Sequence, residues 1–137
     1  MTALSADRAT PQRDGLDRAL PVAGSVTIHA GSLVVLNASG HAQPGDAAAA
    51  THIALGRAEE RVDNAAGSDG DATVRVQRGI FRWANSAAVD AIDLTHIGSP
   101  CYVVDDQTVA ATDDTGARSA AGTVFDVDAQ GVWVVTG

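Results

Sequence analysis

The residues best suited to chemistry are four histidines and one cysteine, and they are widely separated in the sequence. The histidines are His29, His41, His52 and His96, and the cysteine is Cys101. Nucleophilic catalysis needs a nucleophile held beside a base, and none of the five residues lies in a recognisable motif of that kind. Cys101 follows a proline in an apolar stretch, where an inert, packed thiol is expected. The sequence therefore predicts a protein that is not an enzyme.

Sequence motifs for nucleotide binding and covalent catalysis are also absent. There is no Gly-x-Ser-x-Gly, no phosphate-binding loop and no glycine pattern for a dinucleotide. All nine basic residues are arginines, so chemistry that requires lysine, such as Schiff-base formation, is excluded. We expect no cofactor.

Three close pairs of aspartates offer oxygen ligands for a hard cation such as calcium. They are Asp69 with Asp71, Asp105 with Asp106, and Asp113 with Asp114. None of the pairs has the ligand spacing of a calcium-binding loop. Aspartate is also common in turns, because its side chain bonds the nearby backbone. We therefore expect solvated turns at these positions and no metal site.

The aromatic residues make up only 4% of the chain, and each is expected in a core or a subunit interface. We predict a subunit interface that includes Phe81, Trp83 and Trp133. A sugar-binding surface would instead need two or three aromatic side chains exposed on one face. The sequence leaves that alternative open.

The elements that must position these side chains are short β-strands. Val74 and Val76 alternate with polar neighbours, which is typical of a half-buried strand. After Gly79 the apolar residues Phe81 and Trp83 fall on the opposite parity. This switch indicates either a β-bulge at Gly79 or the end of one strand and the start of another. The last two strands are expected to form a hairpin around the three-residue loop 129–131.

These patterns predict an all-β fold. We expect a small β-barrel or sandwich of short antiparallel strands, with one short helical turn within 86–97 and an extended N-terminal arm. The β domain is expected to span residues 25–137, and the arm residues 1–24. The arm holds three arginines and three aspartates, so its charge is zero and the β domain carries the whole net charge of −8.

The arm has two interpretations, a frayed terminus or a segment that becomes ordered on a partner. In the second interpretation its arginines and apolar residues bind that partner. These residues are Arg8, Arg13, Leu16, Arg18, Leu20 and Val22.

Length and composition limit the classes of partner and compartment. With 137 residues, 45% of them hydrophobic, the chain is expected to form one domain with a thin core built mainly of Ala and Val. The acidic charge makes nucleic acid a poor partner. The longest purely aliphatic run, Leu33–Leu36, is far below the ~18 residues of a membrane helix. Residues 1–15 lack the apolar core of a signal peptide, so we expect a reducing cytosol.

The second half of the sequence resembles the phage capsid decoration proteins, also called structural cement proteins. The resemblance spans roughly residues 72 to 137 and lies in the order of six generic β-strand and turn motifs. A Gly-Phe strand is followed by a short helical turn ending in Gly, a Tyr-Val-x-Asp-Asp strand, a short return strand, a Gly-Val strand and a C-terminal hydrophobic strand. The six segments are 78–81, 92–98, 101–106, 108–110, 121–124 and 131–134.

The resemblance implies a non-enzymatic virion protein that binds the outer surface of an icosahedral phage head. Its partners would be the major capsid protein and further copies of itself, commonly in a homotrimer. It would stabilise contacts between capsid subunits against the pressure of the packaged DNA, and it would be synthesised in the bacterial host cytoplasm. Neither nucleic acid nor a membrane is expected as a partner. The alternative is a sugar- or receptor-binding β module on the virion surface.

Overall fold

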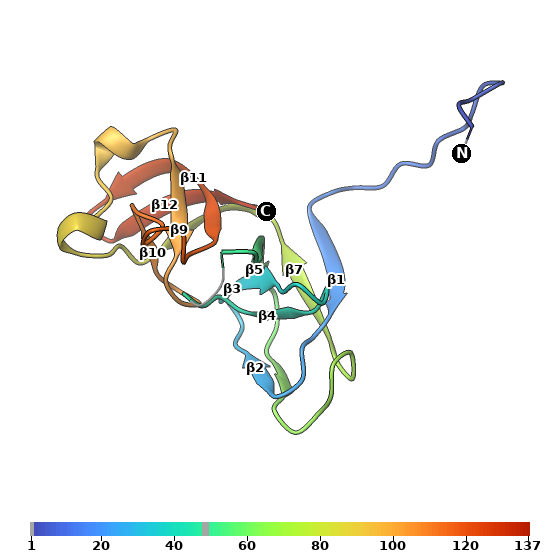
Figure 1. Ribbon diagram of the computed structural model, residues 1–137, viewed down its shortest axis with the longest axis horizontal. Helices are drawn as coiled ribbons and strands as arrows, with labels where there is room; N and C mark the ends of the chain where they lie inside the picture. Colours follow the sequence, from blue (N-terminus) through green and yellow to red (C-terminus); the bar gives the residue numbers. More distant parts are fainter. Residues whose placement is uncertain (1, 48–49) are drawn as a thin grey trace.

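Strands make up most of the regular structure in this computed structural model, which describes residues 2–47 and 50–137. Within those ranges the chain forms three antiparallel sheets and two single 3-10 turns (Figure 1). The predicted all-β fold class is confirmed.

The first sheet has five strands and encloses a core of small aliphatic side chains. Its strand order is β1 (Asp17–Pro21), β7 (Thr73–Gln77), β5 (Ile53–Ala58), β3 (Leu33–Leu36) and β4 (Ala42–Pro44). A two-stranded sheet of β2 (Val26–Ile28) and β6 (Val62–Asn64) lies beside it. The alternation in β7 is that of a half-buried strand, since Val74 and Val76 are buried while Arg75 is exposed. This first core consists of Val22, Ile28, Val34, Ala42, Leu55, Ala58, Val74 and Val76.

The second sheet also has five strands and encloses a separate core. Its order is β10 (Val109–Ala110), β9 (Pro100–Val103), β11 (Ala120–Asp128), β12 (Gly131–Thr136) and β8 (Gly79–Trp83). The two 3-10 turns, η1 (Ala88–Asp90) and η2 (Leu94–His96), lie between β8 and β9, within the segment expected to contain a helical turn. The second core consists of Leu33, Val35, Trp83, Ile92, Cys101, Val103, Val109, Ala121, Val124, Val132 and Val134.

Strand β3 belongs to the first sheet and supplies both cores. Leu33 and Val35 pack in the second core, whereas Val34 packs in the first. Side chains alternate between the two faces of a strand, so an uninterrupted aliphatic run is what a strand with two buried faces requires. A backbone bond from the Leu33 N–H to the Asp106 carbonyl, at 2.7 Å, also ties β3 to the connection between β9 and β10.

The parity switch at Gly79 marks a passage between sheets. Strand β7 ends at Gln77 in the first sheet, and β8 begins at Gly79 in the second. The pairing of β8 with β12 has no register shift, so the second of the two interpretations is correct. The apolar residues change parity because the chain leaves one core and enters the other.

The last hairpin is tighter than expected. Asp128 pairs with Gly131, which leaves Ala129 and Gln130 as a two-residue connection in place of the predicted three-residue loop. The Asp128 carboxylate accepts bonds from the backbone N–H of Gln130 at 2.8 Å and of Gly131 at 3.1 Å. Because the Asp128 side chain itself stabilises the turn, the strand pairing extends one residue further than predicted, to Gly131.

Two glycines allow the strands to approach one another closely. Gly56 (φ +140°) lies at the β3–β5 register shift, where an added Cβ would collide with the Gln77 carbonyl. Gly122 (φ +147°) lies at the β9–β11 shift, where a Cβ would collide with the Val135 carbonyl. Both positions combine backbone angles that L-residues rarely adopt with a lack of space for a side chain.

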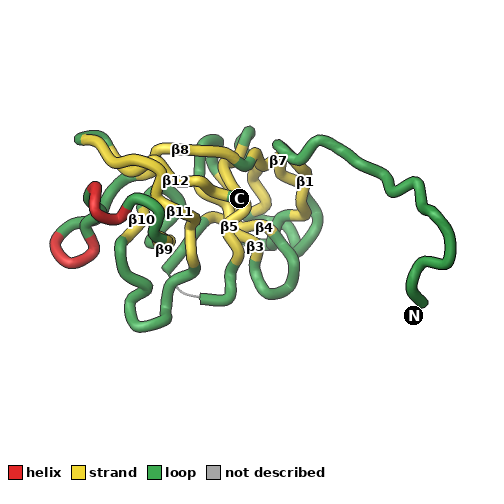
Figure 2. The backbone as a smooth tube through the Cα atoms, turned by 90° about the horizontal axis from the view of Figure 1, so that it is seen from above, coloured by secondary structure: helices red, strands yellow, loops and turns green. Residues whose placement is uncertain are grey.

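The boundary between arm and domain lies earlier than predicted. Residues 17–21 form β1, paired in register with β7, and Val22 lies in the first core. The extended segment is therefore 2–16, which leads away from the strands in two perpendicular views (Figures 1 and 2). Composition placed the boundary at residue 24, because proline, glycine and charged residues are as compatible with an edge strand as with an arm.

The double role of β3 makes a direct prediction for stability. Leu33→Ala removes a fully buried side chain and should lower the free energy of unfolding by about 2–5 kcal/mol. Leu16→Ala is the matched control, because Leu16 is 53% exposed and the change should stay within about 0.5 kcal/mol. Urea denaturation monitored by tryptophan fluorescence measures both. Equal effects of the two substitutions would contradict the assignment of β3 as a shared wall.

Candidate interaction surfaces

The arm is the most accessible part of the molecule. Every residue from 2 to 16 is exposed, including the apolar Leu4 and Leu16. Its attachment to the domain is defined, since the Leu16 carbonyl accepts a bond from the Arg78 N–H at 2.9 Å and Arg18 pairs with Val76 in the sheet. The arm therefore offers backbone and side chains to a partner from a fixed base.

The predicted arm residues divide into two groups. Arg8, Arg13, Leu16 and Arg18 are exposed and accessible. Leu20 packs against the first core, and Val22 is fully buried, so these two residues are part of the domain.

A buried asparagine holds the end of β1 against the loop that follows β6. The Asn64 side chain donates to the carbonyls of Ala23 at 2.9 Å and Ser68 at 3.0 Å. In the same loop the Asp69 carboxylate accepts from the Gly24 N–H at 2.8 Å, and Asp71 accepts from the Ser68 N–H at 2.9 Å. These two aspartates, considered above as cation ligands, bond backbone instead. Across residues 2–47 and 50–137, no three His, Cys, Asp or Glu side chains come together as a metal-binding group.

The three aromatic residues assigned to a subunit interface occupy different environments. Trp83 is only 4% exposed and lies in the second core, where its indole N–H donates to the Thr136 hydroxyl at 3.2 Å. Placing Trp83 at an interface is therefore wrong for this fold: its side chain is already covered by its own chain. Phe81 packs partly against the same core, with its ring centroid 5.9 Å from that of Trp83.

The two partly exposed rings are each covered by a guanidinium group. Arg57 lies 4.6 Å above the Phe81 ring, and Arg82 lies 5.5 Å from the centroid of Trp133. The Trp133 indole N–H donates to Asp128 at 2.9 Å, and this bond is the first cause of a lowered pKa at Asp128. Cation–π contacts of this kind satisfy the ring face within the chain, so Phe81 and Trp133 do not form an open aromatic platform.

The second sheet also exposes apolar residues that were not predicted from the sequence. Ile80 and Val135 are cross-strand neighbours, 44% and 42% exposed, and Ile53 is exposed on the adjoining sheet. Phe125 is exposed at the register shift between β11 and β12. The strict alternation of β8 could have indicated Ile80, because its neighbour Phe81 faces inward. A bulge such as that at Phe125 has no comparable signal in the sequence.

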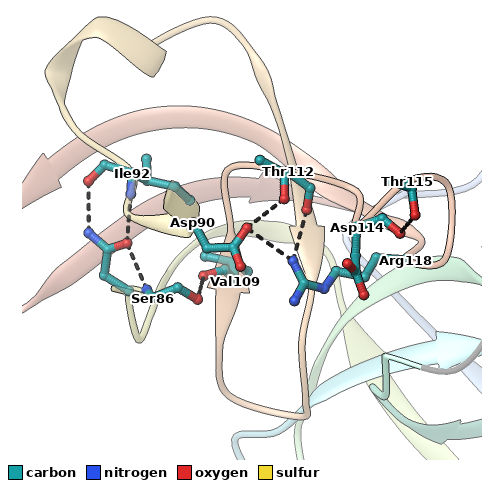
Figure 3. Close-up of polar contacts among 9 residues, drawn as sticks. Ser86, Asp90, Ile92, Val109, Thr112, Asp114, Thr115 and Arg118 are labelled. Carbon is teal, nitrogen blue, oxygen red and sulfur yellow. Dashed lines mark hydrogen bonds and ion pairs between the residues drawn. The ribbon is translucent and has the colours of Figure 1, made fainter. Parts of the chain in front are cut away.

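A compact polar network supports the connection that carries η1 (Figure 3). The Asp90 carboxylate accepts from the Thr112 hydroxyl at 2.5 Å and from the Arg118 guanidinium at 3.2 Å, and Arg118 also donates to the Thr112 carbonyl. Hydrogen bonds from Thr112, and then from Arg118, lower the pKa of Asp90 below its ordinary value. The network fixes the 112–118 loop against η1, and its residues bond one another, so we assign it a structural role.

The lowered pKa at Asp90 predicts a pH dependence of stability. A carboxyl whose pKa is lower in the folded state stabilises the fold above its unfolded pKa of about 3.9, and that contribution is lost as the pH falls through the folded pKa. Asp90→Asn should therefore lower Tm at pH 7, and the difference from wild type should shrink below about pH 4. Asp7→Asn in the exposed arm removes the same charge and should leave the Tm profile unchanged. Thermal unfolding at pH 7, 5, 3 and 2 measures this; a gap independent of pH would refute the role of the carboxylate.

The lone cysteine is chemically protected in the folded protein. Cys101 lies in β9 and is fully buried, and burial raises the pKa of its thiol to about 12. Since the thiolate is the nucleophile, a disulfide-exchange reagent at pH 8 should leave the native protein unlabelled and should react stoichiometrically once urea unfolds it. Rapid labelling of the native state would show that β9 opens readily.

No protein-family model matches the chain, and no curated protein sequence or solved structure matches it either. In the part of the chain that the structure describes, no helix has the length and apolar character needed to cross a membrane. The fold therefore defines an all-β class with a projecting arm, and function has to be inferred from its surfaces.

Proposed function

We propose that the protein is a head-decoration protein, which binds the outer surface of an icosahedral phage head and stabilises the contacts between major capsid subunits. The observation that carries the proposal is that the segments with the sequence resemblance lie together in the fold. The six segments that resemble the decoration proteins fall on consecutive parts of one unit, β8, η2, β9, β10, β11 and β12. Their common location in the second sheet and its connections supports the proposal.

The exposed arm supports the same proposal. An extended, exposed segment can become ordered on a partner surface, at a cost in conformational entropy that limits the affinity of each copy. Repetition over a shell compensates for weak single contacts, because each subunit junction receives its own copy. The partners in this proposal are the major capsid protein and further copies of the chain, on the exterior of the virion after synthesis in the bacterial cytoplasm.

Self-association into a homotrimer is part of the proposal, with a different contact from the one predicted. Trp83 is internal, so the exposed row of Ile80 and Val135 is the better candidate for a contact between copies. The alternative, a sugar- or receptor-binding module, loses its main support, because Trp83 is buried and Arg82 covers the ring of Trp133.

The experiment that tests the proposal measures binding to mature phage heads from which the protein has been removed. Wild-type protein should bind saturably and raise the temperature at which the heads release their DNA. A variant that lacks residues 2–15 should bind more weakly, while its own Tm stays close to that of wild type, because the deleted residues are exposed. Absence of saturable binding by the full chain would exclude the decoration role.

A further inference from the structure

The arginines of this acidic protein are unevenly paired. Four of the nine contact a carboxylate: Arg57 with Glu59, Arg61 with Asp63, Arg75 with Glu60, and Arg118 with Asp90. Within residues 2–47 and 50–137, Arg13, Arg18 and Arg78 have no such partner, and all three line one small cavity at the base of the arm. The two remaining arginines do not line this cavity: Arg8 lies further along the arm, and Arg82 lies over the Trp133 ring.

The cavity has a defined position and a mixed lining. Arg13 comes from the arm, Arg18 from β1, and Arg78 from the link between β7 and β8. The bond from the Arg78 N–H to the Leu16 carbonyl and the pairing of Arg18 with Val76 hold these segments side by side. Leu55 and Val76, both buried, provide apolar lining, and the volume is about 140 Å³. The cavity therefore has the size of one small side chain or anion, with a cationic rim.

The local charge favours an anion although the whole molecule is acidic. The lining contains three arginines and one carboxylate, Asp17. At physiological ionic strength the Debye length is about 8 Å, so a ligand inside the cavity interacts mainly with these arginines, and the distant acidic residues are screened. A polyanion such as DNA extends well beyond the cavity and meets the negative field of the rest of the surface. Short acidic groups are thus preferred to nucleic acid.

A side-chain carboxylate fits this lining better than a free inorganic anion. The guanidinium group presents paired N–H donors that match the two oxygens of a carboxylate. The methylene groups of Asp or Glu can pack on the apolar lining from Leu55 and Val76, a contact that phosphate cannot make. Because Arg13 belongs to the arm, a carboxylate held here would also fix the direction in which the arm leaves the domain.

We propose that the cavity between Arg13, Arg18 and Arg78 binds a side-chain carboxylate on an acidic segment of the capsid subunit. This inference rests on the proposed function and names the chemistry of its partner. The arm and the domain together form the site, so the carboxylate anchors the base of the arm while the remainder of the arm extends along the partner.

The test compares charge-matched variants for binding to heads. Arg78→Gln and Arg13→Gln each remove one charge from the cavity, and Arg61→Gln removes one charge from an exposed residue elsewhere. Loss of one charge-assisted hydrogen bond should weaken binding by about tenfold or more for the first two, whereas Arg61→Gln should stay within about twofold. All four proteins should have similar Tm values, since the substituted side chains are exposed. Equal binding by Arg78→Gln, Arg13→Gln and Arg61→Gln would overturn the proposal.

A second measurement separates this inference from the proposed function. The probe is a glutamate-rich peptide with an amidated C-terminus, titrated against the full chain by calorimetry, with a glutamine-rich peptide as control. Binding of the glutamate peptide that is lost in Arg78→Gln supports the site, even where heads are not bound and the decoration role fails. Head binding by wild type with no effect of Arg78→Gln leaves the decoration role standing and removes the site. Tighter binding of inorganic phosphate, or of a DNA oligonucleotide, than of the glutamate peptide would also overturn the proposal.

Discussion

The fold depends on one strand with two buried faces. Strand β3 places Leu33 and Val35 in the second core and Val34 in the first, so two thin cores share one wall. Neither core contains more than one aromatic residue among its buried members, and Ala and Val bury little area each. A common strand stabilises both cores, because the entropy cost of ordering its backbone arises once while both of its faces bury apolar surface. The fold therefore does not divide into independent halves, although its strands form separate sheets.

The shared strand also links the arm to the second sheet. The arm continues into β1, which pairs with β7, then β5, then β3, and β3 packs in the core of the second sheet. The close approach at Gly56 lies on this path, where β5 meets the end of β7 with no side chain between the two backbones. Strand pairing in the first sheet and packing of β3 in the second core therefore join the base of the arm to both sheets.

The sequence predicted the parts of the fold that depend on local periodicity. The all-β class, the alternation of β7 and the parity switch at Gly79 all follow from the period-two rule for strands. The arm boundary was misplaced, because the pairing of β1 with β7 joins residues far apart in the chain, and a polar edge strand resembles a loop in composition. The interior position of Trp83 was missed for a related reason. A large aromatic residue can be buried either in a core or in a subunit interface, and the sequence does not show that the Trp83 indole bonds Thr136 of the same chain. The cavity of Arg13, Arg18 and Arg78 likewise depends on tertiary pairing and has no motif.

The distribution of charge gains a meaning once the fold is known. The arm is neutral in the sequence, yet its base is locally cationic, because the sheet brings Arg78 to Arg13 and Arg18. Four arginines outside the cavity are paired with carboxylates of the same chain: Arg57, Arg61, Arg75 and Arg118. An acidic surface of this kind repels other acidic molecules at long range, while a cationic cavity without paired carboxylates attracts a carboxylate at short range. The net charge of a small protein and the local charge of one cavity can therefore have opposite signs. Salt screens the distant acidic residues, but it has little effect on arginines in direct contact with a ligand.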